Sequence, residues 1–231
     1  MIDLDYSNFN VYKKAVMKTL HITASRRNPG TMDEQGIPAY LEGSCWSRWV
    51  FWRRTYLASQ FISQRPAGGQ CVDFGCGPGV MLPLLASQFD IVNAIDIRLD
   101  LAQDFAKLWT EHTCQNMTGI RYYDSLESAD MRPDSIDLIL ALDSLEHVDI
   151  LQDVLASMNR LLKPGGHLLI SGPTENLFYR LGRKIVGFSG HYHRRSVYDI
   201  EKAVSKLFKI RSVKNVNFPF TLFLVMDVQK R

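Results

Sequence analysis

Residues 70–79, which read QCVDFGCGPG, decide the fold of this 231-residue chain. They begin as a short apolar strand and continue into a turn with glycine at positions 75, 77 and 79, where the backbone must bend sharply or approach a ligand closely. An apolar helix is predicted to follow over residues 79–88, with Pro83 tolerated in its first turn. A strand, a glycine turn and a helix N-terminus together predict a nucleotide-binding corner.

Two acidic residues near this corner indicate which nucleotide it suits. A dinucleotide fingerprint requires G-x-G-x-x-G, but position 80 is valine and the third glycine comes one residue early. Asp73 ends the strand, where its charge would repel a pyrophosphate and suit an ammonium group. Asp96 ends the next strand, 91–95, where an acid is expected to hold ribose hydroxyls. A ligand with a ribose and an amino-acid ammonium, but no pyrophosphate, is S-adenosylmethionine.

Four further motifs follow residues 73–79 in order. They are Asp96 with Ile97, residues 123–125, residues 142–148 and residues 161–170. In this order and at this spacing, the five motifs resemble those of class I S-adenosylmethionine-dependent methyltransferases, in particular the small-molecule or quinone-type subgroup. The resemblance covers roughly residues 65–228. It implies a Rossmann-like, doubly wound α/β fold with a seven-stranded sheet, mostly parallel with an antiparallel last strand.

Hydrophobic patterning along the chain predicts the same architecture. Strands and helices alternate after residue 70, which predicts a parallel sheet with right-handed crossovers. The last two strands are separated by three residues, which predicts a hairpin. Residues 1–66 are expected to form an N-terminal helical cap with a polar loop through 36–38, and residues 67–231 the cofactor-binding domain, in which 172–195 form a mobile lid-like insertion. The expected strands are 70–74, 91–95, 120–123, 136–141, 167–171, 208–216 and 220–228, and the expected helices 8–25, 45–63, 79–88, 99–112, 149–162 and 196–207.

The carboxyl ends of the strands should form one crevice, and the cofactor-binding residues are expected there. The glycine-loop backbone would pack against the methionine part and ribose, with Asp73 near the amino end of the cofactor. Asp96 would accept hydrogen bonds from the ribose hydroxyls, and capping of the following turn is its alternative role. Opening a turn is the alternative role of Asp124. The expected cofactor-binding residues are Asp73, Gly75, Cys76, Gly77, Gly79, Asp96, Ile97 (adenine face), Asp124 or Ser125 (adenine amine) and Asp143 (near the methyl donor).

Three histidines are candidates for a general base. A hydroxyl or ammonium acceptor must lose a proton during methyl transfer, and histidine titrates near neutral pH. His147 follows the fourth strand of the sheet, where orienting the loop is its alternative role, and His191 and His193 lie in the connection after the fifth. No metal site is predicted, because no cysteines form a C-x-x-C pair.

The helix at 45–63 combines aromatic side chains with three arginines. The aromatic residues are expected to pack between the cap and the sheet, or alternatively to cover the active site as a lid. A solvated or salt-bridged face is the expected environment of Arg48, Arg53 and Arg54, and an arginine that reaches a cofactor or substrate carboxylate is the alternative.

Residues 176–196 contain five arginines or lysines and no acidic residue. They are interpreted as a basic amphipathic helix with three alternative roles: a packed helix with a solvated face, a lid over an amphipathic or anionic substrate, or a peripheral contact with an anionic membrane through 176–188. The net charge of +3 does not indicate nucleic-acid binding. No 18-residue apolar run and no secretory signal are present, so the protein is expected in the cytoplasm.

The sequence therefore predicts an S-adenosylmethionine-dependent methyltransferase that acts on an O or N atom of a small molecule, lipid-like or quinone-like, with S-adenosylhomocysteine as product. One alternative is methylation of RNA or protein through the basic segment 176–196. Another is a non-catalytic partner protein that binds the cofactor or keeps only the fold. The complete set of Asp73, the loop glycines and Asp96 argues against a decayed cofactor pocket.

Overall fold

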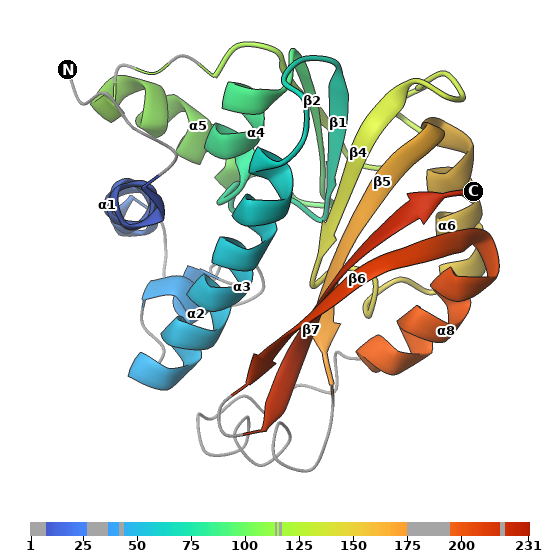
Figure 1. The fold of residues 1–231 in the computed structure, drawn as a ribbon. Coiled ribbons are helices and arrows are strands. Elements are labelled where there is room, and N and C mark those ends of the chain that lie inside the picture. The colour runs from blue at the N-terminus through green and yellow to red at the C-terminus, as the bar shows by residue number, and fades with distance from the viewer. Residues whose placement is uncertain are drawn as a thin grey trace.

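The computed structural model describes residues 8–26, 37–41, 44–113, 115, 117–174, 195–217 and 220–231. Within these residues, one open sheet is flanked by helices on both faces (Figure 1). The helices are α1 (Phe9–Ser25), α2 (Ile37–Leu41), α3 (Cys45–Ser63), α4 (Leu82–Gln88), α5 (Asp100–Thr113), α6 (Leu151–Leu161) and α8 (Val197–Leu207). The strands are β1 (Gln70–Phe74), β2 (Ile91–Ile95), β3 (Ile120–Tyr123), β4 (Ile136–Leu142), β5 (Leu162–Pro173), β6 (Phe208–Asn217) and β7 (Thr221–Lys230).

The sheet has seven strands in the order β3-β2-β1-β4-β5-β7-β6. Neighbouring strands from β3 to β5 are parallel, whereas β7 runs antiparallel to both β5 and β6. The predicted doubly wound sheet with an antiparallel last strand is therefore confirmed. The strand order reverses between β1 and β4, and this switch point is where open α/β sheets bind ligands.

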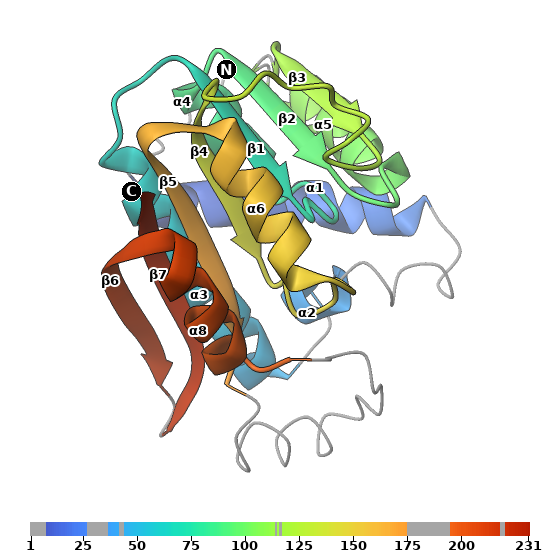
Figure 2. The same ribbon diagram turned by 90° about the vertical axis from the view of Figure 1, so that its right-hand side faces the viewer.

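Both faces of the sheet are buried, and the two faces belong to separate cores. Successive residues of β1 show this, because Cys71 packs into one core and Val72 into the other, and both are fully buried. Helices α4 and α5 lie over one face with α1 and α3 beside them, and α6 and α8 cover the other (Figures 1 and 2). Such two-sided burial explains the nearly continuous apolar sequence of β4.

Three local signals in the sequence set the element boundaries. Ser44 caps α3, as its side chain accepts from the backbone N–H of Ser47 at 3.1 Å. Helix α4 begins at Leu82 rather than at the predicted residue 79, because Gly79 has a φ of +83° that a right-handed helix excludes. Pro83 lies in the first turn of that helix, as predicted.

Two larger differences from the prediction concern α2 and β5. The polar loop expected through 36–38 is partly replaced by the short helix α2, in which Ile37, Tyr40 and Leu41 are buried in the core. Strand β5 begins at Leu162 rather than at 167, because Leu162 pairs with Ile136 before an irregular register shift around residues 163–166. In both cases tertiary packing overrides a glycine- and proline-rich local sequence.

Helices α1 and α3, from the expected N-terminal cap, pack directly on the sheet and on the loop after β1. The hydroxyl of Tyr12 in α1 donates a hydrogen bond to the carbonyl of Val80, immediately after the glycine loop. Phe51 in α3 packs edge-on against Phe223 of β7, with ring centroids 5.9 Å apart. The expected packing of aromatic residues between cap and sheet is therefore observed for the described side chains.

Residues 176–188 lie outside the described residues, so their predicted membrane contact stays a prediction. The described helices include none that is long and apolar enough to cross a membrane.

Candidate active site

The glycine loop after β1 is held in place by backbone hydrogen bonds. The N–H groups of Gly75 and Cys76 both donate to the carbonyl of Ile95, at 2.8 and 3.1 Å, and so tie the loop to the end of β2. Gly75, Gly77 and Gly79 all have positive φ values of 75°, 52° and 83°, which L side chains rarely adopt. The three glycines therefore serve the sharp turn that the sequence predicted.

Gly75 also makes room for the loop that follows β4. A Cβ built at Gly75 would lie 2.4 Å from the Cβ of Ser144, closer than real Cβ atoms approach one another. The sequence led us to expect a ligand at this surface, but in the structure the neighbour of Gly75 is Ser144. Cys76, next in the loop, is buried, and burial raises the pKa of its thiol well above the ordinary value. The thiol is therefore neutral.

Asp73 is a buried carboxylate at the carboxyl end of β1, with only 3% of its surface exposed. Burial, and secondarily the charge of Asp96, raise the pKa of Asp73 to about 7. Its Oδ2 atom accepts no hydrogen bond from any described residue. A buried carboxylate oxygen without a donor is costly, so the site suits a cationic or donor group supplied by a ligand.

Asp96 bridges the glycine loop and the turn after β2. Its Oδ2 accepts from the N–H of Gly77 at 2.8 Å, and its Oδ1 accepts from the N–H of Arg98 at 3.0 Å. The turn-capping role named as an alternative is therefore present. Each carboxylate oxygen can still accept a second hydrogen bond, which leaves capacity for ribose hydroxyls. Ile97, beside it, has 89% of its surface exposed, although it is large and apolar.

Asp143 follows β4 and lies in an ion-paired network that reaches into the cap. Its φ is +54°, and its Oδ1 accepts from the hydroxyl of Ser171 at 2.7 Å. Its Oδ2 is ion-paired with Arg54 of α3, whose side chain is 4% exposed. A second nitrogen of Arg54 donates to the Tyr40 hydroxyl at 2.6 Å. The network therefore joins α2 and α3 to the carboxyl ends of β4 and β5.

The environment of Arg54 differs from the one that the sequence predicts for the three arginines of α3. For Arg48, Arg53 and Arg54 a solvated or salt-bridged face is expected; Arg54 is salt-bridged, but it is buried rather than part of a solvated face. The spacing of apolar residues in α3 contained the signal, because Val50 and Ala58 lie four residues before and after Arg54 and are both buried. An arginine in an apolar stripe requires an acidic partner, and here the partner is Asp143.

Asp124 and Ser125 lie in the turn after β3, the outermost strand on this side. Asp124 is exposed, and Ser125 exchanges hydrogen bonds with Ser128, whose N–H donates to the Ser125 hydroxyl at 3.1 Å. The turn is thus closed by its own serines. Its place beyond a strand end agrees with the adenine-amine role expected for these residues, which stays a prediction.

Of the three candidate histidines, the structure describes only His147. It is exposed in the loop after β4, and its backbone N–H donates to the carbonyl of Ser144 at 3.2 Å. His191 and His193 lie outside the described residues. A fourth histidine, His167 of β5, is hydrogen-bonded through Nδ1 to the carboxylate of Asp227 at 2.8 Å and through Nε2 to Arg65 at 3.0 Å. Within the described residues, no three His, Cys, Asp or Glu side chains are placed to hold a metal ion.

The carboxyl ends of β1, β2 and β4 therefore bring together Asp73, the glycine loop, Asp96 and Asp143. This arrangement, on a sheet of order 3-2-1-4-5-7-6, defines a class I S-adenosylmethionine-dependent methyltransferase. Residues 51–213 match the family described as methyltransferase domain, and the chain belongs to that family. S-Adenosylmethionine is the methyl donor of this class, and the buried, donor-free oxygen of Asp73 fits its ammonium group.

Similar curated proteins include two ubiquinone biosynthesis O-methyltransferases. The chain is 28% identical over 144 residues to the enzyme of Vibrio atlanticus, covering 58% of this chain and 59% of that enzyme. It is 34% identical over 125 residues to the enzyme of Methylococcus capsulatus, covering 52% of this chain and 51% of that one. The chain thus spans 51–59% of the length of these relatives.

Solved structures share the fold at lower sequence identity. The N-methyltransferase NodS from Bradyrhizobium japonicum, solved with S-adenosyl-L-homocysteine, superposes with a TM-score of 0.61 at 15% identity, covering 94% of this chain and 98% of NodS. The PH0226 protein from Pyrococcus horikoshii gives a TM-score of 0.64 at 17% identity, covering 84% and 96%. At these identities the likeness is one of fold.

Proposed function

We propose that this protein transfers a methyl group from S-adenosylmethionine to an oxygen atom of a small, quinol-like acceptor. The observation that carries the proposal is the buried Asp73 carboxylate, which has an oxygen without a donor beside a glycine loop and Asp96. Oxygen is favoured over nitrogen because the curated relatives described above are O-methyltransferases.

The proposed roles follow from where the carboxylates lie. Asp73 would bind the ammonium group, whose charge would draw the carboxyl toward its ionised form. Asp96 would accept hydrogen bonds from the two ribose hydroxyls through the lone pairs left by Gly77 and Arg98. Exposed Ile97 would cover the adenine face, with Asp124 or Ser125 at its amine.

Asp143 and His147 would act on the acceptor side. The bound cofactor would supply an electrophilic methyl group on a sulfonium, so the protein mainly has to align the acceptor and exclude water. Arg54 and Ser171 hold Asp143 in one orientation at the edge of the crevice. His147, exposed in the adjacent loop, would take the proton from the acceptor hydroxyl.

Calorimetry tests the cofactor assignment directly. S-Adenosylmethionine and S-adenosylhomocysteine should both bind the wild-type protein. Asp96→Ala should lose about 100-fold in affinity, since two charge-assisted hydrogen bonds together contribute about 3 kcal/mol. Asp104→Ala, an exposed acid on α5, is the matched control and should bind like wild type. Absence of binding by both ligands would sink the assignment.

Turnover tests the acceptor class. Release of S-adenosylhomocysteine would be measured with a catechol and, as a control, with its dimethyl ether, which has no free hydroxyl. Activity with the catechol alone supports O-methylation, and His147→Gln should lower the rate, because the amide side chain cannot take the proton from the acceptor hydroxyl. Activity that persists with the dimethyl ether, or with RNA in place of the catechol, would contradict the proposal.

A further inference from the structure

An arginine just before α8 holds the loop after β4, the loop that carries His147. Arg195 precedes Ser196, the N-cap of α8, and its Nη1 donates a hydrogen bond to the carbonyl of Val148. Its Nη2 donates to the carbonyl of Asp149 at 2.7 Å. These two residues directly follow His147 in the chain. One side chain thus bridges two consecutive carbonyls beside the candidate base, and we call this arrangement the Arg195 clamp.

Packing fixes the first half of this loop better than the second. At its start, Leu145 and Glu146 are both buried. Further along, His147 is exposed, and Ile150, at the end of the loop, has 59% of its surface exposed. Backbone segments with few buried apolar side chains open readily. The hydrogen bonds from Arg195 therefore act on the half of the loop that packing restrains least.

The clamp starts from a rigid point of the fold. The side chain of Ser196 accepts from the N–H of Asp199, and the Asp199 carboxylate accepts from the N–H of Ser196 at 3.0 Å, which completes a capping box at the start of α8. Val197, the first residue of α8, is fully buried, and a Cβ built on Gly172 of β5 would lie 3.3 Å from its Cβ. The start of α8 is therefore packed closely on the sheet, and Arg195 reaches the loop from a fixed backbone.

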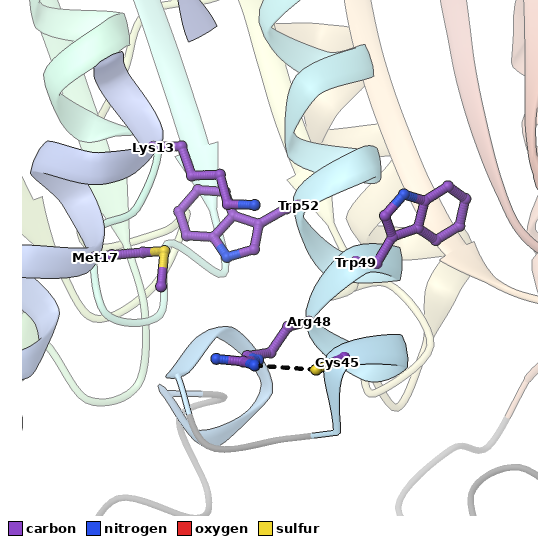
Figure 3. Close-up of a pocket in the computed structure, with 6 residues that line it drawn as sticks. All are labelled: Lys13, Met17, Cys45, Arg48, Trp49 and Trp52. Carbon is purple, nitrogen blue, oxygen red and sulfur yellow. Dashed lines mark hydrogen bonds between the residues drawn. The ribbon is translucent and has the colours of Figure 1, made fainter. Parts of the chain in front are cut away.

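The cap contacts the same loop at a different point. Arg54 of α3 is ion-paired with Asp143, at the start of the loop. Figure 3 shows two other cations of the cap, Lys13 and Arg48, in a hollow between α1 and α3, and no residue from 143 to 150 belongs to the described lining of that hollow. The Arg195 clamp acts from the opposite face of the sheet, where α6 and α8 lie (Figure 2). It therefore adds a restraint that these cations of the cap do not supply.

We propose that Arg195 is a positioning residue for methyl transfer: its two hydrogen bonds hold the loop so that the His147 imidazole faces the acceptor hydroxyl. The inference rests on the proposed function, in which His147 is the base. A base works only within hydrogen-bond reach of the proton that it takes, and a misplacement of about 1 Å can cost about 100-fold in rate. A guanidinium suits this task because its planar fork of N–H groups reaches two acceptors at once, whereas a lysine ammonium is a point charge.

Hydrogen exchange tests the clamp without any turnover. In Arg195→Met, the backbone amides of residues 147–150 should exchange about tenfold faster than in wild type, whereas those of β4 should not change. Lys206→Met removes an exposed cation of the same helix and is the control, which should behave like wild type. Wild-type exchange over residues 147–150 in Arg195→Met would overturn the proposal. If Arg195→Met does not fold, Arg195→Lys takes its place, because one ammonium cannot replace the fork and exchange should still be faster than in wild type.

Kinetics distinguish a positioning role from a purely structural one. With a catechol as acceptor, Arg195→Met should lower kcat about tenfold, while KM for S-adenosylmethionine stays within about twofold of wild type. In a His147→Gln background, Arg195→Met should lower kcat no further, because the group that it positions is gone. A further loss of about tenfold in that background means that Arg195 acts by another route and would refute the positioning role.

The failure of this proposal differs from the failure of the proposed function. If the wild type releases no S-adenosylhomocysteine with the catechol, the proposed function fails, and hydrogen exchange still decides whether Arg195 holds the loop. If the wild type turns over but Arg195→Met keeps the wild-type kcat, methyl transfer stands and the positioning role is refuted. It is refuted equally if His147→Gln keeps the wild-type kcat.

Discussion

Gly75→Ala should destabilise the protein through a steric clash with the loop after β4. Its φ of +75° is unfavourable for alanine by about 1–2 kcal/mol. The new methyl group would lie 2.4 Å from Ser144 Cβ and 3.2 Å from Ser144 Oγ, so the loop must shift. Forcing an extra methyl group into a packed site costs about 1–3 kcal/mol, which gives a total loss of about 2–5 kcal/mol.

Gly165→Ala is the matched control for this variant. Gly165 has the same φ of +75°, but a Cβ there would meet only the side-chain amide of Gln229, at an ordinary 3.5 Å. The free energy of unfolding of Gly165→Ala should therefore fall only by the backbone strain of about 1–2 kcal/mol. The free energy of unfolding would be measured by urea titration followed by far-ultraviolet circular dichroism.

Ser144→Gly provides the decisive background. Without the Ser144 side chain the clash disappears, and Gly75→Ala should then cost no more than Gly165→Ala. The steric argument is refuted if Gly75→Ala and Gly165→Ala cost the same in the wild-type background, or if the excess cost of Gly75→Ala persists when Ser144 is glycine.

Three further predictions concern buried charges. The pKa of Asp73 is raised from 3.8 to about 7, so its folded form holds a proton that the unfolded form has lost, and stability falls as pH rises through this window. Asp73→Asn should abolish that fall in urea titrations across pH; an unchanged pH profile would contradict the assignment. Arg54→Met leaves Asp143, which is only 16% exposed, without its cation and should cost about 3 kcal/mol. In thermal denaturation, the double variant Arg54→Met with Asp143→Asn should be more stable than Arg54→Met alone. If the losses of the two single variants simply add in the double variant, the pairing is excluded. Burial raises the pKa of Asp227, but the hydrogen bond from His167 and the charge of Arg65 outweigh it and hold the pKa below its ordinary value. The stabilisation by this carboxylate is therefore lost as pH falls through that lowered pKa, and Asp227→Asn should be less stable than wild type at pH 7 but not in strong acid. If Asp227→Asn stays less stable than wild type in strong acid, lost packing rather than the lost charge explains the difference.

The central strands were predictable because they are short apolar runs bounded by glycine and polar residues. The bounds of β1, β2 and β3 match the prediction, and β4 extends it by one residue. Burial on both faces favours a strand for β1, β2 and β4, whereas β3 is a partly buried edge strand. Helix α2 was missed because five residues contain too little periodicity, and its stability comes from burying Ile37, Tyr40 and Leu41.

The positions of the candidate site residues were predictable to the extent that they follow strand ends. Asp73, Asp96 and Asp143 could be placed at one edge because parallel strands end on the same side. The pairing of Arg54 with Asp143 was not predictable, since it depends on how α3 docks against the sheet.

The ion pair of Arg54 with Asp143 has a consequence for protein engineering. An exchange of residues 1–66 for the equivalent segment of a relative, intended to change acceptor preference, would remove the cation that neutralises Asp143. It would also remove the Tyr12 hydroxyl that satisfies the carbonyl of Val80. A chimera of this kind must therefore carry an arginine and a tyrosine at these two positions, or replace their acceptors at the same time. Grafts chosen only by the shape of the helices should express poorly.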